Sequence, residues 1–368
     1  MNITYIPLAN PDIRQSDINA VIKVLKSGML VQGKRVEKFE KNIGEFLNTK
    51  NVVATSNGTS TMHLALIALG IGAGDEVIVP AFSHVATANV VELVGATPVF
   101  VDIEIDTFNI DVSKIEKAIT KKTKAIIPVH EFGLACDIVS ILKIAKKYNL
   151  KIIEDAACAL GAKHNGINVG TIGDFGSFSL HPRKAISSGE GGILVVNSDK
   201  LAKEVRILRN HGIDIIDNTT EFVKAGFNYR LTDIQASLVN SQLLRLSKTL
   251  TYKNELAKIY LSQIKNDKIK LPTVSNESTH TWQTFHLLFD SNASRDNAIK
   301  ILKEKKIGTN YGAQCIPAQQ FYKDKYKLNY KKLYPYSYKA YKQGLAIPLY
   351  EKLTIENISY IAEQLNIL

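Results

Sequence analysis

A single lysine in an unusual setting is the strongest chemical signal in this 368-residue sequence. Lys184 lies within GDFGSFSLHPRKAISSGEGG (173–192), among glycines, aromatic residues and hydroxyl residues such as Ser179. An amine shielded from water by such neighbours becomes neutral more readily, and a neutral amine can attack a carbonyl carbon to form a Schiff base. Because surface lysines are far commoner, this interpretation depends on the residues that accompany Lys184.

A second segment has the features of a phosphate site. Ser56-Asn57-Gly58-Thr59 follows the apolar run 52–54 and leads into MHLALIAL (62–69), which is apolar on nearly all sides. A glycine-containing turn before a buried helix leaves several backbone N–H groups without acceptors, and the positive end of the helix attracts an anion there. A capped core helix without a ligand is the alternative interpretation.

An acidic pair supplies the third chemical group. Glu154-Asp155 ends the apolar run 152–153, at the edge where open α/β sheets bind ligands. Because burying an unpaired carboxylate is costly, its partner is expected to be a structural arginine or a protonated ring nitrogen of a cofactor. A phosphate site, an acid at a strand end and a shielded lysine are together the parts that a pyridoxal phosphate enzyme needs.

The elements that must position these groups are buried strands alternating with helices. Continuous apolar runs bounded by turns predict parallel strands at 52–54, 77–79, 99–101, 125–129 and 152–153, and ILVV (193–196) is a further predicted strand. Helical periodicity predicts helices at 16–27, capped by Ser16 and ended by Gly28, at 35–47, and at 137–148 after Asp137. The stretch between 173 and 192 is interpreted as a hydroxyl-rich loop. The pattern predicts an α/β fold with a mostly parallel sheet flanked by helices.

The residue pattern of the chain changes near residue 250. Lys-rich helical patterns dominate from there, and HLLF (286–289) is the best remaining strand signal. We therefore predict a large α/β domain over 1–248, including an N-terminal arm, and a smaller α+β domain over 249–368.

Composition excludes several classes of protein. With 45% hydrophobic and 22% charged residues the chain is neither collagen-like nor wholly disordered, and its net charge of +11 favours anionic partners. Cys136, Cys158 and Cys315 form no CxxC pair, and neither a signal peptide nor a membrane-spanning run is visible, so a soluble cytoplasmic protein is expected. The eight histidines lack ligand spacing, and His130-Glu131 lacks the second histidine of HExxH, so no catalytic metal is expected.

Seven stretches in order resemble the DegT/DnrJ-type nucleotide-sugar aminotransferases, a pyridoxal phosphate-dependent branch of the aspartate-aminotransferase fold (type I). They cover residues 1–245 closely and the remainder loosely. The matching stretches are SGMLVQGKRVEKFE (27–40), TSNGTSTMHLAL (55–66), DEVIVPAFSHVATANVVELVGATPVFVDI (75–103), IIPVHEFG (126–133), IIEDAACALGA (152–162), GDFGSFSLHPRKAISSGEGG (173–192) and GFNYRLTDIQASL (226–238).

The resemblance implies a role for each matching residue. Lys184 would be the catalytic residue that binds pyridoxal 5′-phosphate covalently and moves the proton, and Asp155 would keep the pyridinium nitrogen protonated. Gly58, Thr59 and Ser179 would hold the phosphate.

Other positions in the pocket are expected to contact cofactor or substrate. His84 stands where the family usually has an aromatic residue that stacks on the ring, and Cys158 stands where many relatives have Gln or Glu. Asn228 would reach the phosphate from a second subunit, which implies a homodimer with shared active sites. His181 and Glu190 are candidate substrate residues, although packing or turn roles explain them equally well.

The resemblance also predicts the substrates. The stretches at 27–40 and 80–92 look most like 4-aminotransferases of deoxyamino-sugar biosynthesis, such as those of perosamine synthesis, which act on nucleotide-linked 4-keto-6-deoxyhexoses. Glutamate is the expected amino donor, and a 3-aminotransferase is the alternative within the family.

A nucleic-acid-binding regulator is the rival class. Residues 321–343 contain seven lysines and seven tyrosines, and basic residues interleaved with aromatic ones suit backbone contact and base stacking. The interpretation we favour is a solvated face of the small domain whose tyrosines pack against the large one.

Overall fold

A mixed sheet forms the centre of the computed structural model, which describes residues 4–274 and 277–368. Within those residues the sheet has seven strands, in the order β1 (Val52–Thr55), β10 (Gly192–Val196), β9 (Phe175–Ser179), β6 (Lys151–Asp155), β5 (Thr123–Ile126), β2 (Glu76–Pro80) and β4 (Thr97–Val101). Strand β10 runs antiparallel to both of its neighbours, and the remaining strand pairs are parallel. The mostly parallel sheet predicted from the apolar runs is confirmed.

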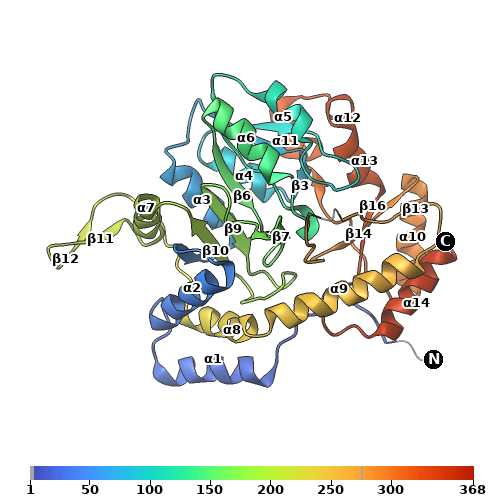
Figure 1. Ribbon diagram of the computed structural model, residues 1–368, viewed down its shortest axis with the longest axis horizontal. Helices are drawn as coiled ribbons and strands as arrows, with labels where there is room; N and C mark the ends of the chain where they lie inside the picture. The colour runs from blue at the N-terminus through green and yellow to red at the C-terminus, as the bar shows by residue number, and fades with distance from the viewer. Residues whose placement is uncertain (1–3, 275–276) are drawn as a thin grey trace.

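Helices cover both faces of this sheet (Figure 1). One face packs against α3 (Gly58–Ala68), α4 (Ala86–Leu93) and α7 (Asp199–Arg209). The opposite face packs against α2 (Lys34–Leu47), α5 (Val112–Ala118), α6 (Ile138–Tyr148) and α8 (Asp233–Leu243). Because helices cover both sides of the strands, the strand sequences are continuous apolar runs and do not alternate between apolar and polar residues.

Helix α1 (Gln15–Ser27) begins one residue earlier than predicted, and Ser16 does not cap it. The N-cap is Arg14, whose backbone N–H donates to the side chain of Asp17 at 2.8 Å. Asp17 is buried and also accepts from Arg245 at 2.6 Å, which ties the start of α1 to the end of α8. Gly28 ends the helix in the left-handed conformation, as predicted.

Strand β9 was not predicted, because the sequence suggested a loop there. Gly176, Ser177 and Ser179 interrupt its two buried phenylalanines, and Gly176 is required because neighbouring backbone lies very close: a Cβ there would lie 1.8 Å from the carbonyl oxygen of Gly170. Close approach of this kind removes the apolar signal that marks the other strands.

The C-terminal part has its own sheet and core. Strand β14 (Phe285–Phe289), predicted as HLLF, pairs with β13 (Ile269–Lys270) and β16 (Gly344–Ile347). Helices α9 (Leu246–Gln263), α10 (Asn292–Glu304) and α14 (Ile355–Asn366) pack around this sheet. The predicted domain boundary at 248/249 falls inside α9, the long gold helix that runs from beside α8 toward the C-terminal part in Figure 1.

Residues 314–343 return from this part to the large sheet. Strand β15 (Gln314–Cys315) pairs with β3 (Phe82–Ser83), and α11 (Gln320–Tyr326), α12 (Tyr330–Leu333) and α13 (Pro335–Gln343) follow it. The rings of Tyr322, Tyr326 and Tyr334 meet Phe100 edge-on, with centroids 5.6, 6.3 and 6.2 Å away. Three of the seven tyrosines of the Lys/Tyr-rich segment therefore pack on Phe100 of the large sheet, as we favoured, whereas Tyr336 is 44% exposed.

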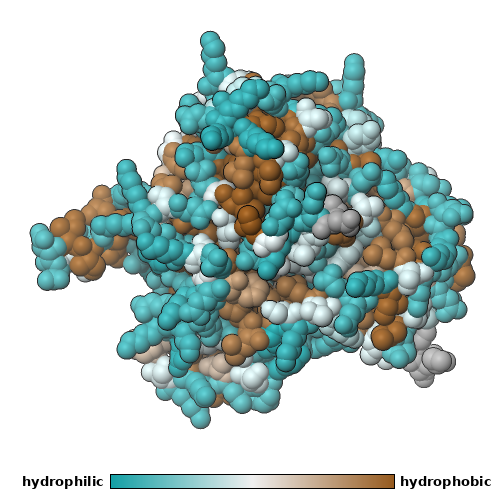
Figure 2. All heavy atoms as spheres, viewed as in Figure 1, coloured by the Kyte–Doolittle hydropathy of each residue, from teal (hydrophilic) through white to brown (hydrophobic). Residues whose placement is uncertain are grey.

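A hairpin projects from the large domain. It is formed by β11 (Ile213–Ile216) and β12 (Thr219–Phe222) and carries exposed apolar side chains (Figures 1 and 2). A shorter hairpin pairs β7 (Lys163–His164) with β8 (Ile167–Asn168). Among the described residues, no helix has both the length and the apolar character needed to cross a membrane.

Candidate active site

A cavity of about 360 Å³ opens at the carboxyl ends of the parallel strands. It brings together most of the residues predicted from the sequence, namely Gly58, Thr59, His84, Asp155, Ser179, His181, Lys184 and Glu190. Asn228 lies elsewhere, exposed and paired with Asn210 through an isolated β-bridge, so it does not reach the cavity of its own chain.

The first corner of the cavity is the start of α3. Asn57 caps this helix by accepting the N–H of Ser60 at 2.8 Å, which leaves the N–H groups of Gly58 and Thr59 without intrahelical acceptors. A Cβ on Gly58 would lie 3.0 Å from the Cβ of Ser179, so glycine lets the helix approach the end of β9 closely. Free N–H groups, the helix dipole and the Ser179 hydroxyl together form an anion site.

The side chains of the predicted acidic pair, Glu154 and Asp155, lie on opposite sides of β6. Asp155 lines the cavity, is 5% exposed, and accepts hydrogen bonds from Thr87 Oγ1 at 2.8 Å and from the N–H of Ala157 at 3.2 Å. Neither of these partners is a cation, so the carboxylate retains the capacity to pair with a positively charged ring nitrogen.

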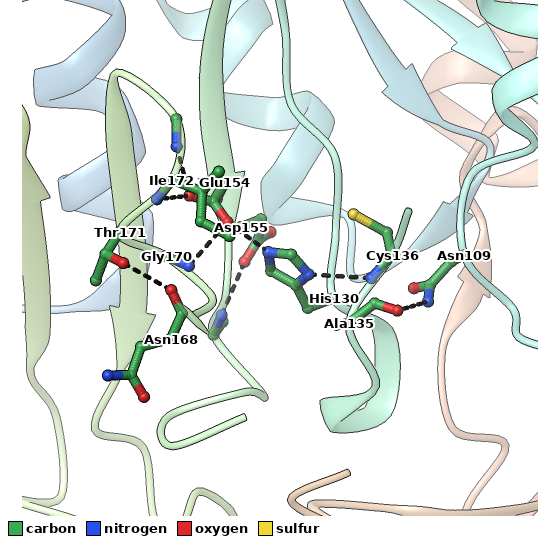
Figure 3. Close-up of polar contacts among 12 residues, drawn as sticks. Asn109, His130, Ala135, Cys136, Glu154, Asp155, Asn168, Gly170, Thr171 and Ile172 are labelled. Carbon is green, nitrogen blue, oxygen red and sulfur yellow. Dashed lines mark hydrogen bonds and ion pairs between the residues drawn. The ribbon is translucent and has the colours of Figure 1, made fainter. Parts of the chain in front are cut away.

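Glu154 has a structural partner instead, as Figure 3 shows. Its fully buried carboxylate pairs with His130 Nε2 at 3.0 Å and accepts the N–H groups of Gly170, Ile172 and Gly173 at 2.7–2.8 Å. Burial opposes the charged imidazole, but Cys136 and the Glu154 carboxylate outweigh it and raise the pKa of His130 to about 10. Glu154 thus fixes the loop 170–173 and the end of β6 behind the site.

Lys184 projects from the turn after β9. Its Nζ lies 3.0 Å from Cys158 Sγ, and its backbone N–H donates to the carbonyl of His181 at 2.8 Å. Burial raises the pKa of the Cys158 thiol, although Lys184 opposes that effect. Cys158 is therefore a neutral neighbour of the amine rather than a competing nucleophile.

His84, His181 and the carboxylate of Glu190 lie at the solvent side of the cavity. His84 Nδ1 accepts the N–H of Ala86 at 3.2 Å, and His181 Nδ1 accepts that of Arg183 at 3.3 Å. Although both rings reach solvent, partial burial and the charge of Lys184 lower their pKa values. The lowered pKa values favour the neutral rings, and a neutral imidazole can stack on a ligand or accept a hydrogen bond from it.

The sequence did not identify three residues of this site, namely Glu131, Thr87 and Arg183. Glu131 and Arg183 line the cavity, and Thr87 holds Asp155. One signal was available: Glu131 lies two residues after the apolar run 125–129, and in a parallel sheet the residues that follow such a run lie at the ligand-binding edge. Within residues 4–274 and 277–368, no group of three histidine, cysteine or acidic side chains is arranged to hold a metal ion.

Comparison of the chain with known proteins identifies its family. The model of the DegT/DnrJ/EryC1/StrS aminotransferase family matches residues 11–366. The chain belongs to this family. It is 37% identical to an uncharacterized protein of Methanocaldococcus jannaschii, over 96% of this chain and 95% of that protein. It is 38% identical to the GDP-perosamine synthase of Caulobacter vibrioides, over 82% of each.

Solved structures agree with this membership. A Streptococcus pneumoniae protein assigned as a sugar aminotransferase and solved in its PLP form superposes with a TM-score of 0.93 at 30% identity, covering 99% of this chain and 98% of that protein. The type I fold predicted from the sequence resemblance is therefore confirmed, as is the aminotransferase class.

Proposed function

We propose that this chain transfers an amino group from glutamate to the C4 keto carbon of a nucleotide-linked keto-deoxysugar. The observation that carries the proposal is the gathering of Lys184, Asp155 and the α3 anion site in one cavity of a chain related to a GDP-perosamine synthase. The comparisons indicate pyridoxal phosphate as the cofactor, since the S. pneumoniae relative was solved in PLP and PMP forms.

The residues of the cavity fit this cofactor. The N–H groups of Gly58 and Thr59 with the Ser179 hydroxyl would hold the phosphate, the buried Asp155 carboxylate would hold a proton on the ring nitrogen, and Lys184 would supply the amine for covalent attachment. When bound, pyridoxal phosphate supplies the electron sink that stabilises negative charge on the reacting carbon.

This chain's own side chains then position and move protons. Thr87 fixes the carboxylate of Asp155 through its hydrogen bond, which aims that carboxylate into the cavity. Lys184 Nζ would take up the proton of the reacting carbon of glutamate and, in the second half-reaction, would supply a proton to the sugar carbon, because no other amine lines the cavity among the described residues.

The complete site would be formed by a homodimer. Asn228 is exposed and lies outside its own cavity, as a residue that serves a second subunit must. Exposed apolar side chains on α1 also favour a second subunit that would bury them. Those of Ile18, Ile22 and Leu25 are 44, 40 and 52% exposed. A two-fold dimer would use such a surface twice and create two equivalent sites.

The test is a screen of nucleotide-linked 4-keto-6-deoxyhexoses and their 3-keto isomers, with glutamate as the donor. Glutamate-dependent amination at C4, absent in Lys184→Ala, would support the proposal. Amination at C3 alone would identify the chain as a 3-aminotransferase. If the cofactor-loaded, yellow protein aminates none of these sugars, the proposed substrate class is wrong.

A further inference from the structure

A buried carboxyl group in the cavity has no role in the function described so far. Glu131 is 5% exposed and lines the cavity together with Lys184 and Asp155. Its Oε2 atom has no hydrogen-bond partner among the described residues. Leaving such an atom unpaired is unfavourable, so a ligand in the cavity that supplies the missing partner would be stabilised by it.

The backbone holds this side chain in place. The N–H of Glu131 donates to Asn109 Oδ1 at 2.9 Å, and the carbonyl of Gly133, two residues on, accepts the N–H of Thr281 at 3.0 Å. Gly133 has φ +100°, and a Cβ there would lie 2.0 Å from Thr281 Oγ1. The turn therefore cannot move Glu131 out of the cavity without disrupting its packing against the segment around Thr281.

The charged groups around Glu131 come from several elements. Asp155 on β6 repels its carboxylate, Lys184 after β9 attracts it, and the Cys158 thiol lies nearby. From β14, His286 stacks on Phe132, but burial lowers the pKa of His286 to about 3 and keeps that ring neutral. Burial and Asp155 together outweigh Lys184 and raise the pKa of Glu131 to about 8.

We propose that Glu131 is a further cofactor-binding residue, a neutral carboxylic acid whose free oxygen donates a hydrogen bond to bound pyridoxal phosphate. The proposal rests on the cofactor assignment, not on which sugar is the substrate. A carboxylic acid has one O–H donor, whereas a carboxylate has none. Ionisation of Glu131 therefore removes the donor and places a second negative charge beside Asp155.

The test measures the affinity of cofactor-free protein for pyridoxal phosphate against pH, followed by visible absorbance. Wild type should bind more weakly as the pH rises from 7 to 9, over and above the change seen in Glu131→Gln, which keeps an N–H donor at every pH. Glu131→Leu should bind roughly three- to tenfold more weakly at pH 7, as expected for one lost hydrogen bond. Thermal unfolding of each cofactor-free variant checks that the fold is retained.

Glu104→Gln is the matched control. Partial desolvation also raises the pKa of Glu104, but this residue is exposed and lies outside the cavity, so its variant should keep the wild-type pH profile. Identical profiles for wild type and Glu131→Gln, or wild-type affinity in Glu131→Leu, would overturn the proposal. Failure of the wild type to bind the cofactor would overturn it together with the cofactor assignment, whereas cofactor binding without sugar amination would overturn only the proposed substrate.

Discussion

Replacing Glu154 by glutamine tests whether the ion pair behind the site stabilises the fold. The glutamate is fully buried, and its two oxygens receive three backbone N–H groups and the imidazole of His130. Glutamine keeps one of these acceptors and turns an N–H₂ group toward donors. Removing one partner of a buried pair costs about 3–5 kcal/mol, so we expect Glu154→Gln to lose that much free energy of unfolding.

The loss should depend on pH in a defined direction. The pKa of His130 is raised from 6.5 to about 10 in the folded state. A raised pKa contributes stability that is fully present below pH 6.5 and is lost as the pH rises toward 10, and Glu154 supplies part of this effect. The deficit of Glu154→Gln relative to wild type should therefore be largest near pH 6.5 and shrink toward pH 10.

The assay is urea unfolding of the cofactor-free protein, followed by far-ultraviolet circular dichroism at several pH values. Glu45→Gln is the control, because Glu45 forms only an exposed pair with Lys41 at 3.9 Å and should change stability by less than about 1 kcal/mol. A deficit below about 1 kcal/mol for Glu154→Gln, or one that is independent of pH, would refute the reasoning.

Further predictions concern the cavity. Lys184→Ala should lose the visible absorbance of the covalently bound cofactor and reduce turnover by orders of magnitude with an unchanged circular dichroism spectrum; comparable turnover would exclude the proposed role. Asp155→Asn should still bind the cofactor through its phosphate but turn over far more slowly, and near-normal kcat would remove Asp155 from the site. Thr87→Val leaves Asp155 without its hydroxyl donor and should weaken cofactor binding several-fold, measured by absorbance titration. Mixing inactive Lys184→Ala and Asn228→Trp subunits should restore about a quarter of the sites, because half of the dimers are mixed and each has one intact site; subunit exchange without recovered activity would contradict the shared site.

Sequence reasoning worked best where one physical property determined the element. The strands at 52–55 and 76–80 lie between two layers of helices, so burial alone made them visible as apolar runs. Asp137 and Gly28 were predicted at helix ends, and both lie there, because capping is a local effect. The prediction that Ser16 caps α1 was wrong because a distant residue, Arg245, fixes the start of the helix through Asp17.

The cavity was predictable only in part for the same reason. The motifs around Lys184 and Asp155 are contiguous in sequence, so residue types and family resemblance both pointed to them. The hydrogen bond from Thr87 to Asp155 and the burial of Glu131 arise from the meeting of α4, β6 and the turn after β5. The contact of Thr87 leaves no pattern in the sequence, since it joins elements that lie far apart along the chain, whereas the position of Glu131 after a strand was visible but its burial was not.

The pairing of β15 with β3 bears on how the enzyme is made. It joins Gln314 to Ser83, and the adjacent Gly312 and Ala313 complete the cavity wall next to His84. Contacts between such distant residues form late in folding, because a long loop must close first. A ribosome therefore releases most of the large domain before the cofactor pocket exists, and a chain interrupted before residue 312 lacks part of the wall that encloses pyridoxal phosphate. The cavity that pyridoxal phosphate is expected to occupy is therefore fully lined only in a chain that extends past residue 313.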